Sequence, residues 1–132
     1  MAQLSICDIN GGAALCEWLG EVPGFYDSEL LDLEIRQGQP SRLKASAFRL
    51  GPGRDGEGFF IVSKHVIVTF EFISLCEVEL YEFEERGYLD GVKFEDDGSG
   101  ITMNFESSAG VHGRIKAKEI SIGFEPKLPH GG

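Results

Sequence analysis

The alternation of apolar and polar side chains is clearest in the middle of the chain, at residues 59–83. One parity there carries Val66, Val68, Phe70 and Phe72, and the other carries Ile67, Thr69, Glu71 and Ile73. A period of two in β-branched and aromatic residues is the pattern of a pleated strand. Residues 77–83 repeat the alternation at once. We therefore predict two neighbouring strands at the centre of the domain.

Other alternating segments flank this central pair. Leucine and isoleucine alternate with charged residues at 31–36, which predicts a half-buried strand, and a partner strand returns through Leu43, Ala45 and Ala47 after a turn at 38–41. Segments 88–95, 101–106 and 111–124 predict three more strands, with a hairpin turn at 96–100. The parity slips at Asp90-Gly91 and near Lys118-Glu119, where we expect bulges.

The expected architecture is mainly β. Strands joined by short turns must be antiparallel, and the faces of so large a sheet need cover. We predict a two-layer antiparallel sheet or sandwich, or one strongly coiled sheet, of about seven to eight strands. Apolar residues at helical spacing over 13–19 add one short N-terminal helix, capped by Asn10 and ended by Gly20, so the fold is α+β if that helix is counted.

Length and composition favour one soluble domain spanning residues 1–132. Hydrophobic residues make up 42% of the chain and charged residues 26%, which is typical of globular proteins. We expect an exposed glycine-rich loop at 51–58, which lacks the GK[ST] ending of a phosphate-binding loop, and a frayed tail at 126–132. No apolar run approaches the roughly 20 residues of a membrane span, and the N-terminus does not resemble a secretory signal.

The net charge of −10 is concentrated in one stretch. Residues 71–97 hold ten acids against Arg86 and Lys93, which is −8 of the total. Binding to nucleic acid would be opposed at long range, whereas a basic protein would be attracted. Glu77 and Glu79 lie two apart on one face and Tyr81 continues that face. With Glu82 and Tyr88, they form a candidate acidic binding surface with aromatic anchors; the alternative is a solvated face that prevents aggregation of strand edges.

A second candidate cluster lies between the helix and the first long strand, where aromatic and acidic residues crowd together. It contains Trp18, Phe25, Tyr26, Asp27 and Glu29. One interpretation is a plug in which Trp18 and Phe25 are buried while Asp27 or Ser28 bonds backbone amides. The other is a ligand-binding role, in which Tyr26 and Asp27 contact the ligand.

The remaining residues do not specify a reaction. Cys7, Cys16 and Cys76 are odd in number and lack a CxxC pair, which argues against a disulfide framework and a zinc site and suits a reducing cytoplasm. Scattered histidines without a nucleophile signature do not predict a catalytic site. Acids this numerous do not single out a glycosidase pair, and the turn at 96–100 lacks the length and closing glutamate of a calcium loop. We expect no enzymatic activity, no cofactor and no metal.

Two segments resemble the immunity protein 50 family of small bacterial proteins. Trp18-Leu19-Gly20, Pro23 and Phe25-Tyr26-Asp27-Ser28-Glu29-Leu30 are similar to its opening W-x-G…P-x-F-H-D-A-E-[LV], with Tyr26 in place of the histidine. Residues 65–72, Leu80, Phe83, Tyr88-Leu89 and Gly91-Val92 resemble its central strands. The resemblance implies a cytoplasmic protein that neutralises a toxin from neighbouring bacteria by occlusion rather than catalysis.

These features favour a non-enzymatic binding protein, an immunity protein whose acidic surface covers a basic toxin. The alternatives are a structural or housekeeping domain, oligomeric through an exposed strand edge, and a small ligand-binding protein with a pocket between the layers.

Overall fold

The computed structural model describes residues 2–25, 28–54, 60–82, 88–107 and 111–127. They form one antiparallel sheet of eight strands with a 3-10 turn and one helix near the N-terminus, as the alternating pattern predicts. The elements in chain order are β1 (Ala2–Leu4), η1 (Ile6–Asp8), α1 (Gly12–Leu19), β2 (Ser28–Glu34), β3 (Ser41–Arg54), β4 (Phe60–Tyr81), β5 (Tyr88–Leu89), β6 (Gly91–Asp96), β7 (Ile101–Glu106) and β8 (His112–Lys127).

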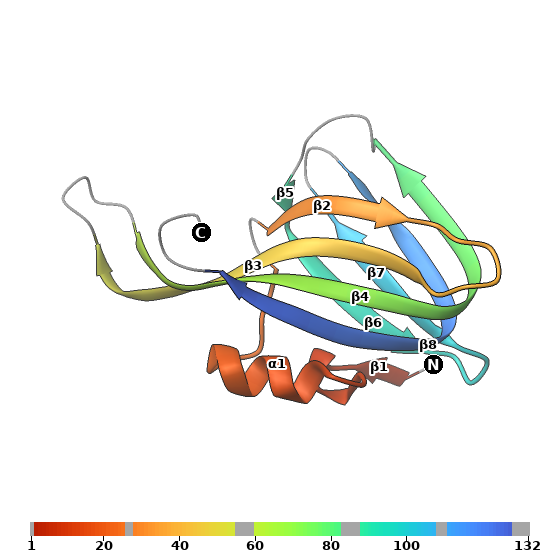
Figure 1. Cartoon of the computed structure of the whole chain (residues 1–132), viewed down its shortest axis with the longest axis horizontal. Coiled ribbons are helices and arrows are strands. Elements are labelled where there is room, and N and C mark those ends of the chain that lie inside the picture. Colours follow the sequence, from red (N-terminus) through yellow and green to blue (C-terminus); the bar gives the residue numbers. More distant parts are fainter. Residues whose placement is uncertain (1, 26–27, 55–59, 83–87, 108–110, 128–132) are drawn as a thin grey trace.

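The sheet curls so strongly that β5, the strand at one end, and β6, the second strand from the other end, are consecutive in the chain. Its strand order is β1-β6-β7-β8-β4-β3-β2-β5, so β5 and β6 are far apart in the order although only Asp90 separates them in sequence. β5 pairs with β2, and β6 pairs with β7. The change of parity predicted at Asp90-Gly91 is present, but it is not a bulge within one strand: the chain leaves β5 and starts β6 with another partner. Figure 1 shows the result: β2 and β3 lie in front, β5, β6 and β7 lie behind, and the long strands β4 and β8 bend from the front layer into the back one.

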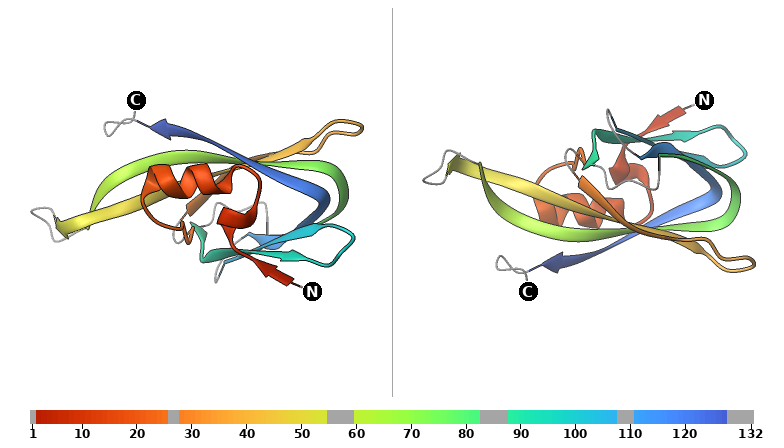
Figure 2. Two further views of the ribbon diagram at one scale, coloured as in Figure 1. Left: turned by 90° about the horizontal axis from the view of Figure 1, so that it is seen from below. Right: turned by 90° about the horizontal axis from the view of Figure 1, so that it is seen from above.

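The core lies between these layers, and α1 lies across one end of them (Figure 2). Val66, Val68, Phe70 and Phe72 of β4 are fully buried, as their parity predicts. Leu15 and Leu19 of α1 are fully buried as well. Gly20 ends the helix in the left-handed conformation, as predicted, with φ 86°. The predicted cap is wrong: Gly11 is the N-cap, and the Asn10 carbonyl instead accepts from the Ile122 amide.

The central segment is one strand rather than the two neighbouring strands that its sequence suggests. β4 runs unbroken from Phe60 to Tyr81, and both of its halves pair with β8. The strand bends where Ser74 takes a positive φ of 58° and Cys76 adds a residue relative to β8. The inward side chains have the same parity on both sides, with Val66 to Phe72 before the irregularity and Val78 and Leu80 after it, so the alternation is interrupted only at 73–77 and the sequence resembles two strands. The parity of β8 does slip at Lys118 and Glu119, as predicted, because both are exposed between the buried Ala117 and Ile120; the residue without a partner in the register is Cys76 of β4.

Two boundaries also differ from expectation. Residues 51–54 of the glycine-rich segment belong to β3, where the register is irregular between Leu50 and Arg54 and Arg54 lies opposite Phe60. Residues 126–127 of the predicted tail belong to β8, where Pro126 lies opposite Val66. The long partner β4 supplies the pairing in both places. Residues 55–58 and 128–132 lie outside the described ranges.

No helix in the described part of the chain has both the length and the apolar character needed to cross a membrane.

Candidate functional site

The outward side chains of β4, β6, β7 and β8 line up in rows across the sheet. This alignment follows from the pairing of the strands, because residues opposite one another on an antiparallel ladder share a face. One row contains Glu95, Thr102, Lys116 and Glu77, and the next contains Lys93, Asn104, Arg114 and Glu79. We call these eight residues, together with Glu106, His112 and Tyr81 beside them, the polar face.

Arg114 connects the two predicted carboxylates of β4. Its Nε lies 3.0 Å from Glu79 Oε2, and one terminal nitrogen lies 3.2 Å from Glu79 Oε1 and 3.7 Å from Glu77 Oε2. The hydrogen bond to Glu79, and then the charge of Glu79, raise the pKa of Arg114. A forked guanidinium matches a carboxylate in this way. The two acids are therefore oriented by a base of the same chain.

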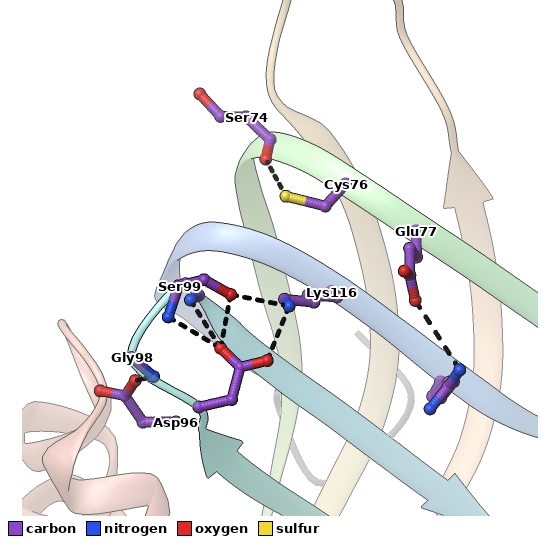
Figure 3. A network of polar contacts seen from close by, with 10 residues as sticks. Ser74, Cys76, Glu77, Asp96, Gly98, Ser99 and Lys116 are labelled. Carbon is purple, nitrogen blue, oxygen red and sulfur yellow. Dashed lines mark hydrogen bonds and ion pairs between the residues drawn. The ribbon is translucent and has the colours of Figure 1, made fainter. Parts of the chain in front are cut away.

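Lys116 orients another carboxylate, that of Asp97, at the turn between β6 and β7. Its Nζ donates to Asp97 Oδ2 at 2.6 Å and to Ser99 Oγ at 2.9 Å, and Figure 3 shows Lys116 reaching toward Ser99. The other Asp97 oxygen accepts from the Ser99 and Gly100 amides. These bonds, chiefly the one from Lys116, lower the pKa of Asp97. The carboxylate thus stabilises the predicted hairpin turn.

A shallow depression of about 530 Å³ lies in the polar face. Its charged lining includes Glu79, Lys93, Glu95, Glu106 and Arg114, and His112 also lines it. The ring of Tyr81 is stacked on His112, with the ring centres 5.2 Å apart and the planes 18° apart. The depression is open to solvent and mixed in charge, so it suits recognition of a polar group on a partner's surface.

Close pairing of β8 with β4 beneath this depression depends on Gly113. A Cβ on Gly113 would lie 2.0 Å from the Glu79 carbonyl oxygen, so any larger residue would push the strands apart. The absence of a side chain here therefore sets the spacing of the rows. Sequence reasoning gave Gly113 no role.

The structure brings together some of the predicted site residues and separates others. Glu77, Glu79 and Tyr81 share the polar face, as their spacing predicts. Glu82 follows the end of β4, is exposed and has a φ of 57°. Tyr88 is 53% exposed in β5, and its carbonyl accepts from Ser107 Oγ at 2.8 Å beside the depression. Tyr26 and Asp27 lie outside the described residues.

Sequence reasoning missed the bases that lie opposite the acids. Arg114 and Lys116 come from β8, more than 30 residues after Glu77 and Glu79, and Arg42 of β3 lies 3.2 Å from Glu71. Several acids of the acidic stretch therefore form ion pairs with bases on neighbouring strands. The alternation of Arg114 and Lys116 with Ile115 indicated that the two bases point outward. Only the strand order shows which acids lie opposite them.

The aromatic cluster near the helix is a packed junction. The Trp18 ring lies 5.7 Å from that of Phe124, and Lys64 Nζ lies 5.0 Å from the Trp18 ring centre. Phe25 is buried, with its ring 5.6 Å from that of Phe70. This packing favours the plug over the ligand site. Of the two residues predicted to bond backbone amides there, Ser28 has a buried hydroxyl with no hydrogen-bond partner among the described residues, and Asp27 lies outside them.

The described residues also bear on metal binding. Among the described ranges, no group of three histidine, cysteine or acidic side chains is arranged to hold a metal ion. At the turn after β6, the Asp97 carboxylate is occupied by Lys116, Ser99 and Gly100.

Comparison with known proteins adds no assignment to this geometry: no family model, no curated protein and no solved structure matches the chain.

Proposed function

We propose that this chain is a non-enzymatic binding protein whose polar face covers a basic protein, with a bacterial toxin as the partner implied by the resemblance of its sequence to immunity proteins. The observation that carries the proposal is the set of carboxylates that line an open depression, with the exposed Tyr81 stacked on His112 of the same lining. Occlusion of the partner, rather than a reaction, is the mode of action.

Charge supports this choice of partner. The whole chain carries a formal charge of −10, so a basic protein is attracted from a distance and the encounter is accelerated. Close to the surface, the depression combines Glu79, Glu95 and Glu106 with Lys93 and Arg114. Such a mixture provides specificity, because a partner must present its own charges in the complementary arrangement.

The rigidity of the strands supports it too. The rows are held by continuous pairing of β6, β7, β8 and β4, so the side chains are arranged before the partner arrives. Tyr81 stacks on His112 and is 53% exposed, which gives the surface an amphipathic aromatic group. Tyrosine is enriched among residues that dominate binding energy at protein interfaces.

A charge-reversal experiment tests the proposal. The partner used is the purified protein encoded next to this gene, because immunity genes lie beside their toxin genes. The variant Glu77→Lys/Glu79→Lys/Glu82→Lys places new positive charges beside Arg114, and we expect calorimetry to record binding at least about 100-fold weaker. Circular dichroism checks that the variant remains folded.

The matched control reverses two exposed acids on other elements, Glu17 of α1 and Asp32 of β2. The variant Glu17→Lys/Asp32→Lys raises the net charge by four, against six in the triple variant, and should lower affinity by less than about tenfold, because it weakens only the long-range attraction. Equal losses of affinity in the two variants would show that binding depends on the net charge alone and not on the polar face. Unchanged affinity in the triple variant, or no complex at low salt, would refute the proposed surface.

A further inference from the structure

Two cysteines that the sequence gave no reason to connect lie in contact beside the helix. The Sγ atoms of Cys7 in η1 and Cys16 in α1 are 2.6 Å apart, and both side chains are partly buried. A disulfide bond is about 2.05 Å long, so the two sulfur atoms are closer to covalent distance than to an ordinary contact between thiols. Cys76, by contrast, lies far along β4, where its thiol donates to the Ser74 carbonyl (Figure 3).

The local fold holds these two thiols together from both sides. Gly12 lies against the Ile6 carbonyl so closely that a Cβ would be 1.8 Å from the oxygen. Cys16 is four residues after Gly12, hence on the same face of α1, and it therefore faces η1 as Gly12 does. On the other side, Ser5 accepts from the Cys7 amide and Asp8 accepts from the Ser5 amide. Neither cysteine depends on a flexible loop for its position.

A metal does not account for the pair. A structural zinc site needs four ligands, and the described residues provide no third histidine, cysteine or acid near the two thiols. A bond between positions 7 and 16 would close a loop of only ten residues, within which η1 and α1 are already folded against each other.

We propose that Cys7 and Cys16 are a redox modification site, at which a reversible intramolecular disulfide joins α1 to the turn that precedes it. The oxidant is a low-molecular-weight disulfide such as oxidised glutathione. Because α1 lies across one end of the curled sheet, the bond ties down the segment that closes that end.

The reaction is a pair of thiol–disulfide exchanges. The Cys7 thiolate attacks one sulfur of oxidised glutathione, which forms a mixed disulfide and releases one glutathione thiolate. Cys16 then attacks the Cys7 sulfur of the mixed disulfide, and the second glutathione leaves. The two cysteines together lose two electrons and two protons, and one oxidised glutathione becomes two reduced glutathiones. Burial, and then the contact with Cys7, raise the pKa of Cys16 to about 12.

The test measures the redox equilibrium of the pair in the folded chain and in the denatured chain. The full chain carries Cys76→Ser, so that only Cys7 and Cys16 can react. It is equilibrated with reduced and oxidised glutathione at a series of ratios and then quenched. Free thiols are labelled with a maleimide, and the mass of the protein is measured by mass spectrometry. We expect both thiols to disappear together with a loss of about 2 Da. The equilibrium constant for oxidation should be roughly 30- to 1000-fold larger in buffer than in denaturant.

Two single-thiol variants serve as controls. Cys7→Ser/Cys76→Ser and Cys16→Ser/Cys76→Ser should each keep one thiol that is labelled or carries glutathione, without the loss of about 2 Da. Oxidation should raise the melting temperature of the Cys76→Ser chain and leave those of the controls unchanged. An equilibrium constant no larger in buffer than in denaturant, or stable glutathione adducts in place of the internal bond, would overturn the proposal. Circular dichroism confirms that each variant is folded.

Discussion

The two halves of β4 share one strand and one partner, β8, yet they face different surroundings. In the first half, Val66 to Phe72 alternate between complete burial and the outer surface. In the second half, Val78 and Leu80 are only partly buried, while Glu77, Glu79 and Tyr81 are exposed. The bend at Ser74 to Cys76 separates the halves.

Under the proposed function, one strand serves two purposes. The first half stabilises the domain by burying apolar surface, the dominant favourable contribution to folding. The second half displays charged groups on a rigid backbone and is held by pairing with β8 and by exposed ion pairs, which contribute little to stability. Substitutions before the bend should therefore affect stability, and those after it should affect mainly recognition and local pairing.

The largest contrast should come from removing one apolar side chain in each half. Phe70 is fully buried, with its ring near those of Phe25 and Phe94, so Phe70→Ala should lower the free energy of unfolding by about 3–5 kcal/mol. Leu80→Ala removes a partly buried side chain and should cost about 1 kcal/mol. Urea denaturation measures both values. Equal losses would show that the core extends past the bend.

Two glycines of β8 provide a finer comparison. A Cβ on Gly113 would lie 2.0 Å from the Glu79 carbonyl oxygen, whereas a Cβ on Gly123, opposite Thr69, meets nothing within 4 Å. Gly113→Ala should lower the free energy of unfolding by about 1–3 kcal/mol. Gly123→Ala should be neutral or stabilising by up to about 1 kcal/mol, because alanine restricts the unfolded chain. A neutral Gly113→Ala would contradict the close approach of β8 to β4.

The smallest expected effect concerns pH and the turn between β6 and β7, where Asp97 is bonded by Lys116, the residue opposite Glu77 in the second half of β4. Hydrogen bonds, chiefly from Lys116, lower the pKa of Asp97, so its contribution to stability is present above the ordinary carboxyl pKa of about 3.9 and is lost as the pH falls below it. Asp97→Asn should therefore flatten the fall of melting temperature between about pH 4 and pH 2. Asp32→Asn on β2 is the control and should keep the steeper profile. High salt should make the pH profiles of the Asp97→Asn and Asp32→Asn variants more alike, because Asp97 is at the surface and its ion pair is screened.

Local patterns in the sequence predicted the parts of the fold that depend on local geometry. The alternation at Val66 to Phe72, at Leu43 to Ala47 and at Met103 and Phe105 identified inward side chains correctly, because each strand has a period of two wherever it lies. The turn at 96–100 was recognisable because Asp97 and Gly98 are typical turn residues, and Gly98 indeed has a positive φ.

What the sequence did not predict depends on contacts between distant segments. A bend within one long strand and a turn between two strands interrupt the alternation in the same way, and Ser74 is not a glycine, the residue that usually marks a left-handed conformation. The ion pairs of Arg114 and Lys116 depend on the strand order. The contact between Cys7 and Cys16 depends on how closely Gly12 approaches Ile6, which spacing alone does not reveal.

The single residue between β5 and β6 has a mechanical consequence. The Asp90 amide donates to the Glu106 carbonyl at 2.7 Å, while the adjacent Leu89 lies opposite Ser28 of β2. Glu106 also lines the depression of the polar face. A tether this short cannot absorb a shear between β6 and β7 without pulling on β2. Asp90 and Leu89 therefore fasten the edge of β2 directly to the strand that carries one wall of the depression.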